Sequence, residues 1–247
     1  MHTIQLELSI CFQSKWHCGS GEASFLIDRL MRRDARNLPY IPGSTLKGVV
    51  RENCERLSRT LGFPEPCDPH DARLSHPDAF RPLKCVNSQV EAIFGTKYEG
   101  GRLFFRDARL KEAPSYDRFF QTRVMMNRKL GTVKDKHLFS TEYALPSTYM
   151  DMRFNTQIDG QCRNLLCSQP GDIPLAFCLL IAGILGVERL GGDKSTGGGR
   201  VQVDIDLIQY NDAKISLDDV LDYLEYYAGL APELFSSEDE SKGRGCP

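Results

Sequence analysis

Residues 39–56 of the chain read Pro-Tyr-Ile-Pro-Gly-Ser-Thr-Leu-Lys-Gly-Val-Val-Arg-Glu-Asn-Cys-Glu-Arg. Pro42 and Gly43 interrupt whatever structure precedes them, and Ser44 is suited to cap the N-terminus of a helix. Apolar residues then recur at intervals of three or four, which predicts an amphipathic helix over residues 44–61. These apolar residues are Leu46, Val49, Val50, Cys54 and Leu57.

The start of this helix has the composition of a phosphate-binding site. Free N–H groups at a helix N-terminus attract anions, and here the hydroxyl groups of Ser44 and Thr45 accompany them. Lys47 lies near the end of the first turn, and Arg51 lies one turn further along. These residues predict contacts with a nucleic-acid backbone, although a surface helix with an ordinary cap has the same pattern.

A second distinctive stretch, residues 190–201, reads Leu-Gly-Gly-Asp-Lys-Ser-Thr-Gly-Gly-Gly-Arg-Val. Its glycines allow backbone N–H groups to approach a phosphate closely, and Lys194, Ser195 and Thr196 add one charge and two hydroxyls. The order Gly-x4-Gly-Lys-Ser/Thr of a P-loop is absent. The stretch is either a phosphate-binding loop of another kind or a flexible turn.

Together these stretches resemble the RAMP superfamily (repeat-associated mysterious proteins) of CRISPR systems. The similar segments are Ile-Pro-Gly-Ser-Thr-Leu-Lys-Gly-x-x-Arg at 41–51 and Leu-Gly-Gly-x-x-Ser-x-Gly-x-Gly-Arg-Val at 190–201. Two further segments are similar to the repeating backbone subunit of type III effector complexes. They are His17-x-Gly-x-Gly with the apolar run that ends in Asp28, and Ile93-Phe-Gly-Thr leading to Gly101-Arg-Leu-x-x-Arg-Asp-Ala108.

The resemblance implies a subunit that lines up with other RAMP subunits along a CRISPR guide RNA paired with target RNA. The helix start and the glycine loop would hold the guide backbone, while base pairing supplies sequence specificity. In the family, the aspartate at the position of Asp28 is needed to cut target RNA, with Mg²⁺ or Mn²⁺ as the cofactor. Two alternatives remain. One is a non-catalytic structural or capping subunit that binds guide RNA only, and the other is a guide-processing ribonuclease, which would need a histidine acid–base pair.

Residues 14–37 contain this catalytic candidate and a basic cluster. A carboxylate near a scissile phosphate, such as Asp28, can hold a divalent metal ion or help to activate a 2′-hydroxyl. Asp34 is a second candidate, and His17 could assist, although a lone histidine is more often structural. Four arginines within eight residues suit contacts with an RNA backbone, unless the loop is simply solvated. They are Arg29, Arg32, Arg33 and Arg36.

Residues 62–90 are rich in proline and histidine and predict an insertion with little core of its own. Cys67, His70 and Cys85 are residues of the kind that bind zinc, with Cys54 or His76 as the fourth ligand. The resemblance implies the same, because related proteins carry a zinc-binding insertion here. We therefore expect a structural Zn²⁺ bound by Cys54, Cys67, His70 and Cys85; the alternative is a loop with buried thiols and exposed histidines.

Residues 111–147 interleave basic residues with apolar and aromatic ones, and Gly131 with Thr132 suits a hairpin tip. This pattern favours backbone neutralisation together with insertion beside unstacked bases. The resemblance implies a thumb, a hairpin that lies across the guide–target duplex and displaces a base pair at regular intervals. The expected RNA contacts are Arg123, Met126 and Arg128. A hairpin packed on the domain, with its charges solvated, is the alternative.

Bulk properties narrow the class of protein. A chain of 247 residues can bury a full core in one domain, and it has no apolar run long enough to span a membrane. With no signal segment recognisable, we expect a cytoplasmic protein of a prokaryote. The nine cysteines then indicate reduced thiols or metal ligands rather than disulfides. The net charge of −2 argues against a uniformly basic nucleic-acid binder, so RNA contacts must come from a local surface.

The remaining hydrophobic pattern predicts the order of the other elements. Strands are expected at 3–12, 101–110, 148–159 and 201–208, with helices after Pro174 and from Ser216 to about Leu230. This order predicts an α+β fold, a ferredoxin-like (RRM-type) βαββαβ core with a zinc-type insertion and a thumb hairpin. One domain would cover 1–235, with the insertion at 62–90, the thumb at 111–147 and a polar tail at 236–247.

Overall fold

The central sheet is built around β1 (His2–Phe12), in which buried apolar residues alternate with more exposed ones. β1 pairs antiparallel with β6 (Arg153–Cys162) on one side and with β7 (Val201–Tyr210) on the other. The sheet order is β2-β6-β1-β7-β8, and β3 also pairs with β6. The short strands are β2 (Leu103–Phe105), β3 (Arg109–Leu110) and β8 (Ala213–Lys214). The predicted α+β class with an antiparallel sheet is confirmed.

This structure is a computed structural model. It describes residues 1–64, 66, 88–96, 100–111, 118–145, 152–162, 165–167, 169 and 172–235. Most of the predicted insertion and the whole of the predicted tail lie outside these residues.

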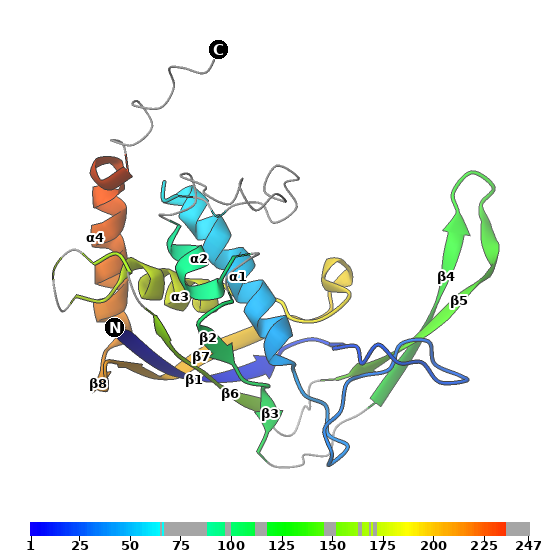
Figure 1. Ribbon diagram of the computed structural model, residues 1–247. Coiled ribbons are helices and arrows are strands. Elements are labelled where there is room, and N and C mark those ends of the chain that lie inside the picture. The colour runs from blue at the N-terminus through cyan, green and yellow to red at the C-terminus, as the bar shows by residue number, and fades with distance from the viewer. Residues whose placement is uncertain are drawn as a thin grey trace.

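The helices of the described chain gather on one face of the central sheet (Figure 1). They are α1 (Gly43–Thr60), α2 (Gln89–Phe94), α3 (Leu175–Leu185) and α4 (Leu217–Phe235). α3 contacts each of the other three, which explains why nearly all of its side chains are apolar and buried. No helix in the described part of the chain is both long enough and apolar enough to cross a membrane.

α1 and α3 approach each other closely at a glycine. A Cβ atom placed on Gly183 would lie 2.4 Å from Sγ of Cys54, so α1 could not pack here against a larger residue. Cys54 is fully buried on the apolar stripe of α1 together with Leu46 and Val50. The stripe predicted for this helix is therefore its core-facing side.

Three predicted boundaries differ from the structure. The N-cap of α1 is Pro42, and Ser44 already lies inside the helix without a side-chain cap bond. The strand expected at 101–110 is divided into β2 and β3, because Ala108 leaves β6 and exchanges both backbone hydrogen bonds with Ile41 (2.8 and 3.0 Å). The strand expected at 148–159 is described from Arg153 to Cys162.

A hairpin of β4 (Arg118–Asn127) and β5 (Thr132–Ala144) forms a separate two-stranded sheet. It extends away from the body of the domain, and the loop between β1 and α1 lies beside its base (Figure 1). Gly131 has the positive φ of 64° that the tight turn requires. The hairpin occupies the segment in which the sequence predicts the thumb.

Candidate nucleic-acid interface

Three segments that are distant in sequence enclose one cavity of about 460 Å³. They are the loop after β1, the first turn of α1, and the loop from residue 190 to residue 199. The lining residues are His17, Cys18, Gly19, Gly21, Glu22, Asp28, Arg29, Leu30, Thr45, Gly191, Gly192 and Lys194. Five of the residues predicted to bind or cut RNA, namely His17, Asp28, Arg29, Thr45 and Lys194, therefore lie around a single hollow.

The glycine loop is held against the loop after β1 by backbone hydrogen bonds. The Gly192 N–H donates to the carbonyl of His17, and the Gly199 N–H donates to that of Lys15, both at 2.8 Å. A Cβ atom on Gly191, where φ is 87°, would lie 2.4 Å from the His17 carbonyl oxygen. These glycines permit one loop to lie directly on another, a role that the sequence analysis did not foresee.

Asp28 joins the same loop to the hairpin. The N–H groups of Asp28 and Arg29 both donate to the carbonyl of Ser140 in β5 at 3.1 Å, and the Ser140 N–H donates to Oδ2 of Asp28 at 2.6 Å. Asp28 remains exposed to solvent at the rim of the cavity. Its carboxylate is therefore oriented by the hairpin backbone and still open to a ligand.

His17 is nearly completely buried, with 2% of its surface exposed. Burial is the main cause that lowers its pKa, the nearby Arg29 guanidinium acts in the same direction, and together they outweigh the bond to Glu142 and the carboxylates of Asp193 and Glu142. Nδ1 lies 2.7 Å from the carbonyl oxygen of Glu142, which can only accept, so the proton of the neutral ring is on Nδ1. A neutral, fixed imidazole suits a structural role better than it suits acid–base exchange.

A group of polar and charged side chains joins the glycine loop to the hairpin and to Arg29 of the cavity lining. Asp193 in the glycine loop accepts a hydrogen bond from Nη1 of Arg123 at 3.0 Å and from the hydroxyl of Tyr143, and it pairs with Nη1 of Arg29 at 3.7 Å. Burial alone would raise the pKa of Asp193. The Tyr143 hydroxyl and the two guanidinium groups outweigh it and hold that pKa below its ordinary value.

The start of α1 differs from the prediction that its N–H groups are free. The Gly43 N–H donates to Oδ1 of Asp107 at 3.0 Å, so a carboxylate of the chain itself already occupies the anion position. Thr45 lines the cavity, whereas Ser44 is exposed and does not. Asp107 was the missed residue, although it belongs to the Arg-Asp-Ala segment that carries the family resemblance.

The two basic residues further along α1 point elsewhere. Nζ of Lys47 lies 6.0 Å from the centre of the Phe105 ring, outside the cavity lining. Arg51 donates to Oε1 of Glu55 at 2.8 Å and to the carbonyl of Gly95 at 3.4 Å. The structure therefore does not place Lys47 or Arg51, both predicted to contact phosphate, in the cavity lining.

The predicted arginine cluster does not form one patch. Only Arg29 lines the main cavity. Arg32 donates to the carbonyl of Ser20 at 3.2 Å, and Arg33 pairs with the nearly buried Glu142 at 2.5 Å. These two line a separate hollow of about 360 Å³.

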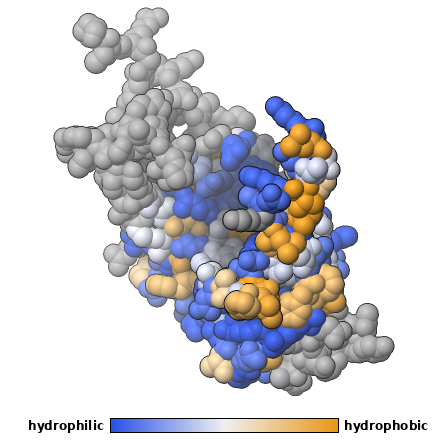
Figure 2. All heavy atoms as spheres, turned by 90° about the vertical axis from the view of Figure 1, so that its right-hand side faces the viewer, coloured by the Kyte–Doolittle hydropathy of each residue, from blue (hydrophilic) through white to orange (hydrophobic). Residues whose placement is uncertain are grey.

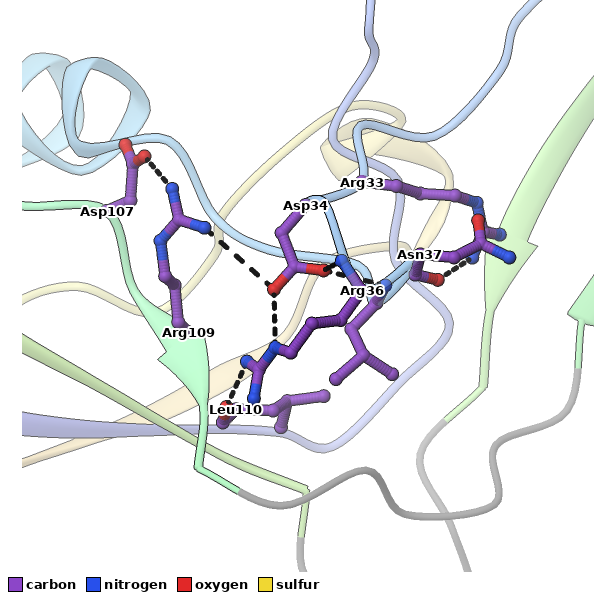
Figure 3. Close-up of polar contacts among 8 residues, drawn as sticks. Arg33, Asp34, Arg36, Asn37, Asp107, Arg109 and Leu110 are labelled. Atoms are coloured by element: carbon purple, nitrogen blue, oxygen red, sulfur yellow. Dashed lines mark hydrogen bonds and ion pairs between the residues drawn. The ribbon is translucent and has the colours of Figure 1, made fainter.

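Asp34, the second catalytic candidate, is occupied in a structural junction (Figure 3). Its Oδ1 accepts the N–H groups of Arg36 (2.9 Å) and Leu38 (3.0 Å), and its Oδ2 accepts Nε of Arg36 (3.2 Å). Arg109 adds an ion pair at 3.8 Å and also donates to Asp107 at 2.9 Å. The Leu38 bond, aided by Arg36, holds the pKa of Asp34 below its ordinary value. Asp34 thus fastens the loop before α1 to β3.

The hairpin carries the exposed basic and apolar side chains that the sequence predicts. Met126 is 52% exposed, and Arg128 lies near the tip in solvent. Figure 2 shows hydrophobic residues interleaved with hydrophilic ones on the end of the molecule that bears the hairpin. The exposed apolar residues of the hairpin are Phe119, Phe120, Val124, Met125, Met126, Leu130, Val133 and Leu138.

The predicted zinc ligands Cys67, His70 and Cys85 lie outside the described residues. Cys54 lies in the core, where its thiol donates to the carbonyl of Leu179 at 3.3 Å and burial raises its pKa. A thiol must lose its proton to bind zinc, so this environment does not suit Cys54 as a ligand. Within the described residues, no group of three His, Cys, Asp or Glu side chains could hold a metal ion by itself.

Two solved chains have the same fold at 14% sequence identity. One is from a cryo-EM structure of type III-B Cmr-beta in the apo state, with a TM-score of 0.51, covering 82% of this chain and 97% of that one. The other is from type III-B Cmr-beta bound to cognate target RNA, with a TM-score of 0.52, covering 81% and 96%.

Two sequence comparisons gave different results. No curated protein sequence matches the chain. The family model of the RAMP superfamily matches residues 10–202, which include the whole cavity lining. The chain belongs to the RAMP superfamily.

Proposed function

We propose that this protein is a guide-RNA-binding backbone subunit of a type III CRISPR interference complex, a cytoplasmic ribonucleoprotein, and that it cuts target RNA paired to the guide. The observation that carries the proposal is the convergence of Asp28, Arg29, Thr45 and Lys194, from three separate segments, on one cavity at the base of the hairpin. The structural likeness to chains from two structures of type III-B Cmr-beta, one of which is of the complex bound to cognate target RNA, supports it.

RNA backbone would enter this hollow beside Arg29 and Lys194, whose positive charges offset the carboxylates of Glu22 and Asp28 in the lining, while the chain as a whole carries a net charge of −2. Thr45 and the exposed hydroxyls of Ser195 and Thr196 would add neutral contacts to phosphate or ribose. The basic and apolar hairpin would lie against the paired strands, with Met126 and Arg128 near its tip. Base pairing, and not the protein, would read the sequence.

Asp28 is the proposed catalytic residue. Mg²⁺ is commonly bound by one or two carboxylates together with substrate phosphates, so Asp28 beside an RNA phosphate would suffice where the described residues alone offer no closed metal site. A bound ion would stabilise charge on the scissile phosphate. The contribution of the chain is to hold the Asp28 carboxylate at the cavity rim through the Ser140 N–H.

A non-catalytic backbone subunit is the second candidate, favoured by that same hydrogen bond. If Asp28 serves only to attach its loop to β5, the residue is structural and a neighbouring subunit cuts the RNA. The two functions predict different results for two substitutions at one position.

The test is cleavage of target RNA by the assembled complex in Mg²⁺, with Asp28→Asn and Asp28→Ala compared with wild type. Asparagine can still accept the Ser140 N–H through its amide oxygen, but it lacks the carboxylate charge. A catalytic Asp28 predicts a loss of about 10²-fold or more in both variants, with guide and target binding intact. Cleavage that survives in Asp28→Asn and fails only in Asp28→Ala would assign a structural role.

Two further proposals concern the fold. We interpret the order β1-α1-β2-β6-α3-β7 as a ferredoxin-like βαββαβ core into which the hairpin is inserted. We also propose that residues 62–90 bind zinc through Cys67, His70 and Cys85, with His76 more suitable than the buried Cys54 as the fourth ligand. Zinc content of the purified chain before and after His76→Ala tests the second proposal.

A further inference from the structure

Asp193 contacts side chains from three segments that are distant from it in the sequence. Its carboxylate meets Arg123 from β4, Tyr143 from β5 and Arg29 from the loop that carries Asp28. The side chain is 14% exposed, so these contacts are partly shielded from water. One carboxylate therefore contacts both strands of the hairpin and the loop of the proposed catalytic residue.

The loop that presents this carboxylate is itself fixed. Asp193 has a left-handed backbone conformation with φ 59°, and its carbonyl accepts the N–H groups of Thr196 at 3.0 Å and Gly198 at 3.1 Å. The neighbouring Gly192 and Gly199 are bonded to the segment that follows β1. Asp193 thus projects from a platform that is continuous with the central sheet.

The hairpin, by contrast, is not part of the central sheet. Its base is attached to the body through the paired backbones of Trp16 and Ala144 and through a bond from Lys15 to Gln121 at 2.7 Å. β5 is also bonded to the Asp28 loop, through the Ser140 contacts and through the Glu142 N–H, which donates to the carbonyl of Arg29 at 3.0 Å. A hairpin outside the central sheet can tilt together with the loop bonded to it, unless further contacts join both to the body of the domain. The contacts of Asp193 with Arg123 and Tyr143 are placed where they would prevent it.

We propose that Asp193 is a positioning residue that locks the hairpin and the Asp28 loop into one geometry and so determines which phosphate is cut. The proposal rests on the function proposed above. It also assigns Arg123 a different role from the one that the sequence predicts, because its guanidinium is engaged by the protein. Arg29 is shared between this lock and the cavity.

The substitution that tests the lock is Asp193→Asn. Asparagine tolerates a left-handed backbone, whereas alanine at φ 59° would add strain unrelated to the contacts. The asparagine side chain keeps an oxygen that accepts the Tyr143 hydroxyl, but it lacks the negative charge that attracts the two arginines. The matched control is Asp159→Asn, which breaks a more exposed ion pair, to Arg106 at 3.0 Å, between two residues that do not line the cavity.

In the assembled complex with Mg²⁺, we expect Asp193→Asn to bind guide and target within about twofold of wild type. The rate of cutting falls about tenfold, and the cuts spread over neighbouring phosphates. Asp159→Asn cuts at the wild-type rate and positions. A loss of folding alone would reduce the amount of active complex without moving the cuts.

Hydrogen exchange of the full chain without RNA keeps the lock testable if Asp28 proves not to be catalytic. Amides of residues 139–143 should exchange faster in Asp193→Asn than in Asp159→Asn. Equal exchange in the two variants would overturn the proposal. So would unchanged cut positions accompanied by tighter RNA binding, because Asp193 would then only compete with phosphate for Arg29 and Arg123.

Discussion

The interface between α1 and α3 and the junction around the cavity are held together by different means. α1 and α3 meet through apolar side chains and one close approach, Gly183 against Cys54. The junction is held by backbone hydrogen bonds and by carboxylates that each serve several partners, such as Glu142 and Asp193. At the helix interface many residues each contribute part of the stabilising free energy. At the junction, a single substitution can remove several stabilising contacts at once.

The largest effect should come from the charged pair at the junction. Arg33→Ala leaves the Glu142 carboxylate, whose side chain is 4% exposed, without the guanidinium that lies 2.5 Å away. Removing one partner of a buried ion pair is strongly destabilising, and we expect a loss of about 3 kcal/mol in the free energy of unfolding. Urea denaturation of the full chain measures it.

Arg32→Ala is the control for that experiment. Arg32 lines the same hollow, but within the described residues its guanidinium donates to the Ser20 carbonyl and pairs with no carboxylate. We therefore expect a loss of about 1 kcal/mol. If both variants lost the same small amount, the junction would not depend on its buried charges and the contrast with the helix interface would fail.

A smaller effect is expected at the helix interface. Gly183→Ala places a methyl group 2.4 Å from Sγ of Cys54, and overpacking of about 3 kcal/mol is offset by about 1 kcal/mol of improved helix propensity. The net loss is about 2 kcal/mol. Adding Cys54→Ala makes room for the methyl group. The double variant should therefore lose less free energy of unfolding than the sum of the two single losses.

The matched control at this interface is Cys162→Ala, a buried cysteine in β6. It should combine additively with Gly183→Ala. Additivity with Cys54→Ala as well would mean that the loss in Gly183→Ala does not arise from contact with Cys54, and the close approach of these two residues would not limit how the helices pack.

The contrast also separates what the sequence could predict from what it could not. β1 and α1 follow from their hydrophobic periods, and α3 from a long apolar run after Pro174, because burial imposes these patterns. Motif resemblance singled out Asp28 and Lys194, and the structure places both in the lining of one cavity. Polar partners have no period, so nothing indicated that Asp107 would occupy the start of α1 or that Asp193 would hold Arg123.

The smallest predicted effect distinguishes two lysines that the sequence treats alike. Lys194 lines the cavity, and Lys47 lies against the Phe105 ring outside it. Lys194→Ala should weaken guide RNA binding about fivefold, close to 1 kcal/mol, and reduce the slope of log affinity against log salt by about 1. Filter binding by the full chain over a series of salt concentrations measures both quantities.

Lys47→Ala serves as the comparison, because it removes the same charge from the same protein. A side chain that contacts no phosphate leaves the salt slope unchanged, since no additional counterion is released when RNA binds. A lower slope in Lys47→Ala and an unchanged one in Lys194→Ala would place the RNA along the side of α1 near Phe105. The cavity would then be a consequence of how three loops pack, and its junction of charges would serve stability alone.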